Sequence, residues 1–216
     1  ELKINRQNFL KMLNKTKISI SNDDTRHYLN GIFLRITEAQ GRNFLTGVAT
    51  DSHRLSSSSL EVQNLSNFNP IILPRKTTFQ ICSLLTETNN ELEMQTSENR
   101  IKFTLGNTKL ISKVIDGKFP DYKKVVPTNN DKTLIVSSKD FISSIERVAS
   151  VSLDRKEGVK LLINKDNVQL SVNSANSGEG NEKIKANFSS FFHKSIGLLH
   201  QPNQSKGWKS LETVCQ

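Results

Sequence analysis

A short pattern of apolar residues occurs twice in this chain of 216 residues, and it constrains the fold more than any other feature. Leu2-Lys3-Ile4 alternates like a strand and precedes a segment around Phe9 whose apolar residues recur at helical spacing. Leu134-Ile135-Val136 and the segment around Phe141 repeat both parts at the same separation, and two strand-like runs follow each time. A repeated strand–helix–strand–strand unit predicts two tandem copies of one architecture.

The first copy continues with alternating segments that are separated by short turns rich in Asn and Gly. Asn5 or Asn8 is a candidate cap for the first helix, and apolar spacing predicts a second helix over residues 76–85. Strands with one polar face and tight connections favour antiparallel pairing. The sequence therefore predicts an α+β fold with antiparallel sheets, whose strands in this copy cover residues 2–4, 28–36, 43–48, 55–60, 71–73, 92–95, 100–105 and 108–113.

The second copy is shorter, with strands expected over residues 158–163, 168–173 and 179–188. Residues 191–216 show neither the helical nor the strand period, so we expect a tail foreign to the fold, for which a shift of reading frame is one explanation. The chain has no initiator Met, so we also expect a fragment of a longer chain. The predicted organisation is a complete unit over 1–127, a linker over 128–132, a partial unit over 133–190 and a divergent tail over 191–216.

The chain carries a formal net charge of +9, which favours polyanions such as DNA, RNA or an anionic membrane. The abundance of Lys and Asn leaves a second explanation open, namely a proteome of biased composition. Cys82 and Cys215 form no disulfide framework, which fits a reducing cytoplasm. No apolar run approaches the roughly 20 residues that cross a bilayer, so we expect no membrane association.

Motifs for chemistry are weak in this sequence. The four His and two Cys residues form no metal-ligand spacing, and Gly117-Lys118 lacks the flanking residues of a phosphate-binding loop. Asp51 and His53 are the best candidates for a catalytic pair, since residues two apart on a strand share a face. Their place between two strand-like runs equally favours a capped hairpin turn. We expect no catalytic residues, metal or cofactor.

The segment from Val114 to Pro127 is rich in Gly, Pro and aromatic residues. It suits a connection between the two copies, in which Phe119 and Tyr122 fix the segment to the fold and Lys123-Lys124 stays in solvent. The Phe, Pro and Val residues of this segment could also form the floor of a groove for a partner's apolar side chains.

Four motifs together carry a resemblance to a known family. They are Arg26-His27-Tyr28-Leu29-Asn30-Gly31, Ala49-Thr50-Asp51-Ser52-His53-Arg54-Leu55, Ile72-Leu73-Pro74-Arg75-Lys76 and Ile115-Asp116-Gly117-Lys118-Phe119-Pro120-Asp121-Tyr122. In order and spacing they closely resemble the bacterial sliding clamp, the beta subunit of DNA polymerase III. The resemblance spans Glu1 to about Ser190, which corresponds to the family's middle domain and the first half of its C-terminal domain.

This resemblance implies a fold, partners and sites. The family forms a head-to-tail homodimeric ring of clamp units, with antiparallel sheets outside and helices on the inner face around double-stranded DNA, and it acts as a processivity factor without chemistry of its own. Without the family's first domain, we expect this chain to form no closed ring. A short peptide motif docks the polymerase III catalytic subunit, the clamp loader and other replication and repair proteins. A basic module that binds nucleic acid by direct contact, without encircling it, is the alternative.

The implied site residues fall into two groups. Ser52 stands where the family usually has Gly, and Lys124 where an Arg is common. The groove positions are Leu29, Thr50, Ser52, His53, Arg54, Leu55, Pro120, Lys124 and Val125. The positions expected to face DNA, or else to be ordinary solvated residues, are Lys11, Lys15, Lys17, Arg26, Tyr28, Lys76, Lys139 and Arg147.

Overall fold

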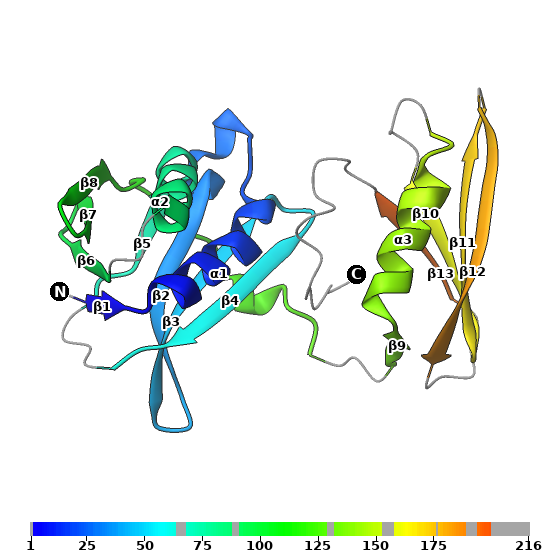
Figure 1. Ribbon diagram of the computed structural model, residues 1–216, viewed down its shortest axis with the longest axis horizontal. Helices are drawn as coiled ribbons and strands as arrows, with labels where there is room; N and C mark the ends of the chain where they lie inside the picture. Colours follow the sequence, from blue (N-terminus) through cyan, green and yellow to red (C-terminus); the bar gives the residue numbers. More distant parts are fainter. Residues whose placement is uncertain are drawn as a thin grey trace. The chain divides into compact units, whose positions relative to one another are not determined.

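The computed structural model describes residues 2–63, 68–87, 91–128, 132–152, 158–175, 177–188 and 194–199. These residues divide into two compact units, the first ending at Val126 and the second beginning at Pro127. Each unit combines antiparallel strands with helices (Figure 1). Within the described part of the chain, no helix is both long and apolar enough to cross a membrane.

The first unit contains two four-stranded antiparallel sheets, ordered β1-β6-β7-β8 and β4-β3-β2-β5. The sheets exchange strands, because β1 pairs with β6 late in the unit while β5 pairs with the early β2. The elements are β1 (Leu2–Ile4), α1 (Arg6–Thr16), η1 (Lys17–Ser19), η2 (Asp24–Leu29), β2 (Gly31–Ala39), β3 (Arg42–Thr50), β4 (Leu55–Glu61), β5 (Ile71–Pro74), α2 (Arg75–Glu87), β6 (Leu92–Thr96), β7 (Arg100–Leu105), β8 (Thr108–Lys113) and η3 (Tyr122–Lys124).

Helix α1 begins where Asn5 supplies its cap. The Asn5 Oδ1 accepts a hydrogen bond from the backbone N–H of Asn8 at 3.0 Å, which satisfies one of the free donors of the first turn. Phe9, Met12 and Leu13 then lie on one buried face of the helix. The Phe9 ring lies 6.0 Å from that of Phe103 on β7, so this face joins the two sheets in one core.

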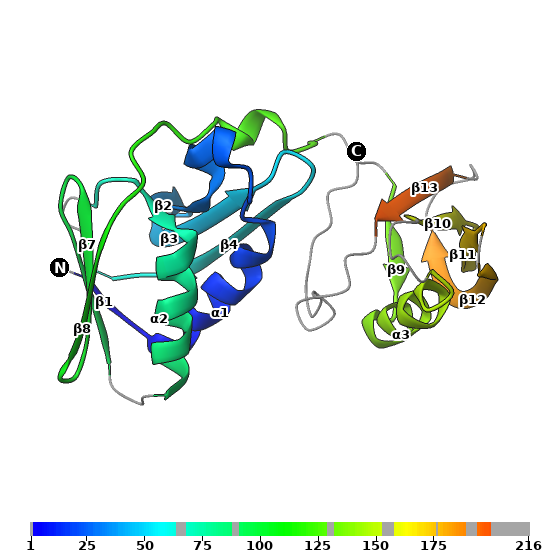
Figure 2. The ribbon, with the colours of Figure 1, turned by 90° about the horizontal axis from the view of Figure 1, so that it is seen from above.

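The β4-β3-β2-β5 sheet is covered on both faces. Figure 2 shows α1 and α2 along one side of β2, β3 and β4, and the segment that follows β8 along the other side. Leu45 and Ala49 of β3 belong to the main core with α1, whereas Val48 belongs to a second cluster with Phe119. The sheet therefore separates a helical side from a side covered by an irregular segment.

The second unit has one five-stranded antiparallel sheet, ordered β13-β10-β11-β12-β9, and one described helix. Ser137 caps that helix, whose residues Ile145 and Val148 pack against the sheet. The elements are β9 (Leu134–Val136), α3 (Ser138–Ala149), β10 (Gly158–Ile163), β11 (Asn167–Ser174), β12 (Gly178–Phe188) and β13 (Lys194–Leu199).

The predicted repeat is confirmed, since β1-α1-β2-β3 and β9-α3-β10-β11 follow one another in the same order. The first strands differ in their pairing, because β1 pairs with β6 whereas β9 pairs with β12. No strand equivalent to β6 occurs among the described residues of the second unit, so β9 completes the sheet of its own repeat.

Two expectations from the sequence are wrong. Tyr28 and Leu29 do not begin a strand: they end η2, which starts where the Asp23 carboxylate accepts a hydrogen bond from Thr25 N–H. Residues 194–199, placed in a tail foreign to the fold, form β13, which pairs with β10 as β5 pairs with β2. The run is only six residues long and contains Gly197, a residue depleted in strands, so its strand signal is weak. Residues 200–216 lie outside the described part.

Gly31 generates a prediction about the pairing of β2 with β5. A Cβ at Gly31 would lie 2.3 Å from the carbonyl oxygen of Leu73, so the two backbones approach too closely for any side chain. We expect Gly31→Ala to lower the free energy of unfolding by about 2 kcal/mol, as overpacking does, measured by urea denaturation followed by circular dichroism. Gly47→Ala is the control, because its nearest contact is a side-chain carbon of Ile32 at 3.3 Å. An equal loss in both variants contradicts the prediction.

Candidate functional site

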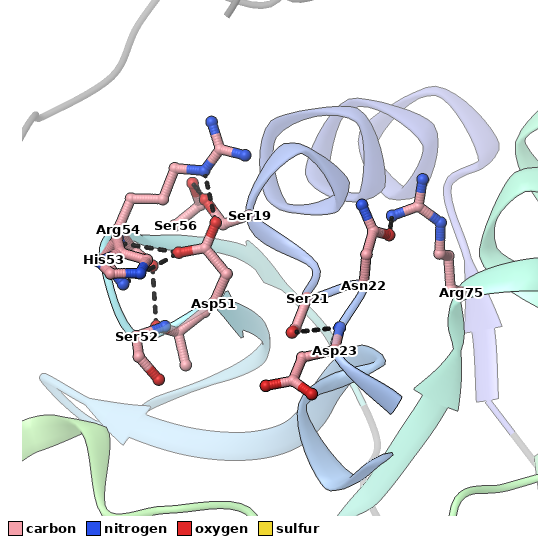
Figure 3. Close-up of polar contacts among 11 residues, drawn as sticks. Ser19, Ser21, Asn22, Asp23, Asp51, Ser52, His53, Arg54, Ser56 and Arg75 are labelled. Atoms are coloured by element: carbon pink, nitrogen blue, oxygen red, sulfur yellow. Dashed lines mark hydrogen bonds and ion pairs between the residues drawn. The ribbon is translucent and has the colours of Figure 1, made fainter. Parts of the chain in front are cut away.

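The turn between β3 and β4 is closed by its own side chains (Figure 3). The Asp51 Oδ1 accepts hydrogen bonds from the backbone N–H groups of His53 and Arg54, each at 3.0 Å. The other oxygen, Oδ2, pairs with Arg54 Nε at 3.0 Å. Thr50 Oγ1 donates to the Arg54 carbonyl at 2.8 Å and accepts from Ser52 N–H. These bonds make the turn a rigid platform rather than a mobile loop.

This geometry gives no support to a catalytic pair. The Asp51 carboxylate is occupied by two backbone N–H groups and a guanidinium. Within the described residues no hydrogen bond joins it to the exposed imidazole of His53. A general base needs a group that orients its ring, so the hairpin-turn interpretation accounts for Asp51.

Ser52 sits at the tip of this turn with an unusual backbone conformation. Its φ of 76° lies in the left-handed region, which favours glycine because a Cβ crowds the backbone there. The Ser52 hydroxyl accepts a hydrogen bond from the Arg26 guanidinium at 2.6 Å. The turn is thereby linked to η2, which lies 26 residues earlier in the chain.

Arg26 is itself fixed by Asp23, the residue that caps η2. The Arg26 Nε donates to the Asp23 Oδ2 at 2.8 Å, while the other carboxylate oxygen accepts from Thr25. Hydrogen bonds from Thr25, followed by that from Arg26, lower the pKa of Asp23 from 3.8 to about 2. Asp23 is therefore ionised at neutral pH and holds Arg26 towards Ser52.

An apolar cluster, here called the outer cluster, lies on the sheet face opposite the helices. Its buried members are Leu29, Val48, Ile72 and Phe119. The Phe119 ring stacks on that of Phe33, with the centroids 4.9 Å apart and the planes within 5°. Ile115 N–H bonds the Ile72 carbonyl at 3.0 Å, so residues 115–119 are fixed to the edge of the sheet by backbone and side chains together.

The structure brings the predicted groove residues into one region of the first unit. Leu29 and Leu55 belong to the outer cluster or pack on it, and the turn that contains Ser52, His53 and Arg54 adjoins Leu55. Pro120 follows Phe119 directly in the chain, Lys124 and Val125 come shortly after Tyr122, which packs on the cluster, and Val125 is 57% exposed. Lys124 pairs with Asp121 at 3.6 Å.

Several members of the outer cluster were not assigned to the site from the sequence. These members are Phe33, Val48, Ile72, Ile115 and Tyr122. Val48 carried a usable signal, because it lies in a run of apolar and small residues too continuous for a strand with one solvated face.

The predicted DNA-facing residues occupy different surroundings. Lys11 is exposed on α1, Lys76 on α2 and Lys139 on α3, while Lys15 and Lys17 are half-buried. Arg26 and Tyr28 join the turn and the outer cluster instead of a helix face. Arg147 donates from Nε to Glu182 Oε2 at 3.1 Å, and this bond lowers the pKa of Glu182. The positive charge of Arg147 is therefore already paired with a carboxylate of the same unit.

A metal site is not found in the part of the chain that the structure describes, where no three His, Cys, Asp or Glu side chains gather. The site consists of a buried apolar cluster, bordered by the half-buried Leu55 and the exposed Pro120 and Val125, beside a rigid polar turn. Such an arrangement can bind apolar groups of a ligand.

A repeated unit of antiparallel sheets backed by helices defines the class of sliding clamps, and the comparisons agree. Residues 3–121 match the family described as DNA polymerase III beta subunit, central domain, and residues 123–197 match its C-terminal domain. The chain belongs to the DNA polymerase III beta subunit family.

Individual relatives in this family share about a third of the aligned residues with this chain. The beta sliding clamp of Rickettsia felis is 36% identical over 190 residues, and that of Caulobacter vibrioides 32% over 180 residues. These matches cover 85% and 83% of this chain but 48% of each relative, so the chain spans about half the length of the curated relatives it matches.

Solved clamps have the same fold. A beta sliding clamp of Caulobacter crescentus superposes with a TM-score of 0.88 at 30% identity, covering 92% of this chain and 53% of that one. A clamp of Bartonella birtlesii bound to griselimycin gives 0.85 at 35% identity, covering 92% and 54%.

The left-handed conformation of Ser52 generates a prediction about the turn. Ser52→Gly removes the backbone strain, whereas Ser52→Ala keeps it, and both lose the bond from Arg26. We therefore expect the Gly variant to be the more stable by about 1 kcal/mol, measured by urea denaturation. Ser57 is the control, because it is exposed in the extended strand β4, where Gly destabilises relative to Ala. The same order of Gly and Ala at both positions contradicts the account.

Proposed function

We propose that this chain supplies the partner-docking and DNA-contacting parts of a sliding clamp, which tethers a DNA polymerase to double-stranded DNA without chemistry of its own. Membership of the beta subunit family supports this proposal. The observation that carries it is the outer cluster, a buried apolar cluster beside the Ser52 turn that is separate from the main core and is bordered by the half-buried Leu55 and the exposed Pro120 and Val125.

The outer cluster has the properties of a docking surface for a short peptide. Its floor is buried and fixed by the stack of Phe33 on Phe119. Leu55 is half-buried beside it, and Pro120 and Val125 are exposed. Apolar side chains of a partner gain most where a rigid floor lets them displace water without ordering the protein. The partners we propose are the polymerase III catalytic subunit, the clamp loader and other replication and repair proteins.

The DNA-contacting part is assigned to the helices. Residues 2–22 and 70–86, which include α1 and all of α2 except its last residue, Glu87, contain no Asp or Glu but seven Lys or Arg residues. Such a surface attracts phosphates without reading bases, which suits a protein that must slide. Lys139 on α3 belongs to the same proposal, whereas Arg147 is occupied by Glu182.

A basic module that binds nucleic acid by direct contact is the second candidate, favoured by the net charge of +9. Both candidates need the cationic helices. Only the clamp needs an apolar docking surface, so binding of a ligand to the outer cluster separates them.

Griselimycin provides the test, because a solved relative is bound to it. We expect this chain to bind griselimycin, and Leu55→Ala or Pro120→Ala to weaken binding by about tenfold, as loss of an interface anchor does, measured by isothermal titration calorimetry. Ile111→Ala is the matched control, since Ile111 is 59% exposed on β8, outside the outer cluster. If griselimycin binds all three variants as tightly as the parent chain, the outer cluster is not the docking surface.

A further inference from the structure

Phe79 is an exposed aromatic residue held between two cations. It lies on α2, and its side chain is 44% exposed, although a Phe is ordinarily buried. The Lys17 Nζ lies 5.2 Å from the ring centroid and the Arg75 Cζ 5.3 Å from it. Both distances are within the range of cation–π attraction. The ring therefore brings two like charges together that would otherwise repel.

The two cations are positioned from their backbones as well. The Lys17 N–H closes the C-terminal end of α1 on the Leu13 carbonyl. The Arg75 N–H donates to the Asn30 carbonyl at 2.9 Å, and its guanidinium donates to the Asn22 side chain (Figure 3). Each side chain thus starts from a fixed point and ends at the same ring.

No acid neutralises this pair in the described structure. None of the ion pairs among the described residues involves Lys17 or Arg75. Arg42 and Phe44 show the contrasting case on β3, where the Arg42 Cζ lies 5.8 Å from the ring but the guanidinium also pairs with Glu61 at 3.2 Å. The Arg42 charge is satisfied within the protein, whereas those of Lys17 and Arg75 remain available to an anion.

We propose that Phe79 holds Lys17 and Arg75 as a two-point clamp for phosphates along one strand of a nucleic-acid backbone. The two charges lie no further apart than the sum of their distances from the ring. A strand of DNA carries a phosphate about every 3.4 Å along its axis, so more than one phosphate of a strand falls within this limit. Phe79 acts as a positioning residue: it fixes the cations before binding and reduces the side-chain ordering that binding requires.

This inference rests on the proposed function only in taking DNA as the ligand of the helices. It adds Arg75 and Phe79 to the predicted contacts, and it distinguishes a residue that supplies charge from one that positions charge. The two roles have different signatures, because the salt dependence of binding counts neutralised phosphates.

The test measures binding of the whole chain to a short labelled duplex by fluorescence anisotropy over a series of salt concentrations. Phe79→Leu should weaken binding by about tenfold, the effect expected for loss of two exposed ring contacts, without changing the salt slope. Phe79→Tyr keeps the ring and should bind like the parent chain. Lys17→Gln and Arg75→Gln should each reduce the slope by about 0.9.

Phe44→Leu is the matched control, since its arginine is already paired, and it should leave binding unchanged. If Phe79→Leu binds as tightly as the parent chain while the two Gln variants reduce the slope, the positioning role is wrong but the DNA contact stands. If the parent chain shows no salt-dependent binding to the duplex, both the clamp pair and the proposed DNA contact are wrong.

Discussion

Strand β3 is the element on which the rest of the first unit depends, because it is buried on both faces. Residues 45–49 are buried without interruption, which a sheet with one solvated face does not allow. Leu45 faces the helices, Val48 faces the outer cluster, and Thr46 bonds the hydroxyls of Thr37 and Ser59, each at 2.8 Å. Burial of a Leu or Val side chain contributes about 1.5–3 kcal/mol, so the fold requires a cover on each side of this strand.

The two segments that cover the faces of β3 differ in chemistry. For this reason the proposed function assigns DNA to one face and a peptide partner to the other. Helices α1 and α2 bury their apolar faces in the core and leave a polar face whose charged side chains are cations, apart from Glu87 at the C-terminal end of α2. The segment from Ile115 to Phe119 is irregular and narrow, so apolar side chains such as Leu55 remain accessible beside it. Under the proposed function, one sheet thus carries a surface for polyanions and a surface for apolar ligands. The bond from Arg26 to Ser52 fixes the turn that borders the second surface.

Much of the fold could be predicted because periodicity is strong where one face is buried. The antiparallel strands β6, β7 and β8 followed from alternation, and side-chain chemistry left Asn5 or Asn8 as the cap of α1, of which the structure has Asn5. Tyr28 and Leu29 were misassigned because a local bond at Asp23 starts a 3-10 helix that extends into the first two residues of the expected strand at 28–36. The strand at Lys194–Leu199 was missed because pairing with β10, a long-range contact, overrides its weak pattern. The cluster of Phe79 with Lys17 and Arg75 joins residues far apart in sequence, which no spacing rule reports.

The most direct test of a sheet with two distinct surfaces is a map of backbone amide chemical shifts by NMR, recorded with griselimycin and, separately, with duplex DNA. The account predicts that griselimycin shifts amides of the turn at 50–55 and of residues 115–125, and that DNA shifts those of α1, η1 and the start of α2. Shifts by both ligands in the same set of residues, or by griselimycin in the helices alone, would contradict it.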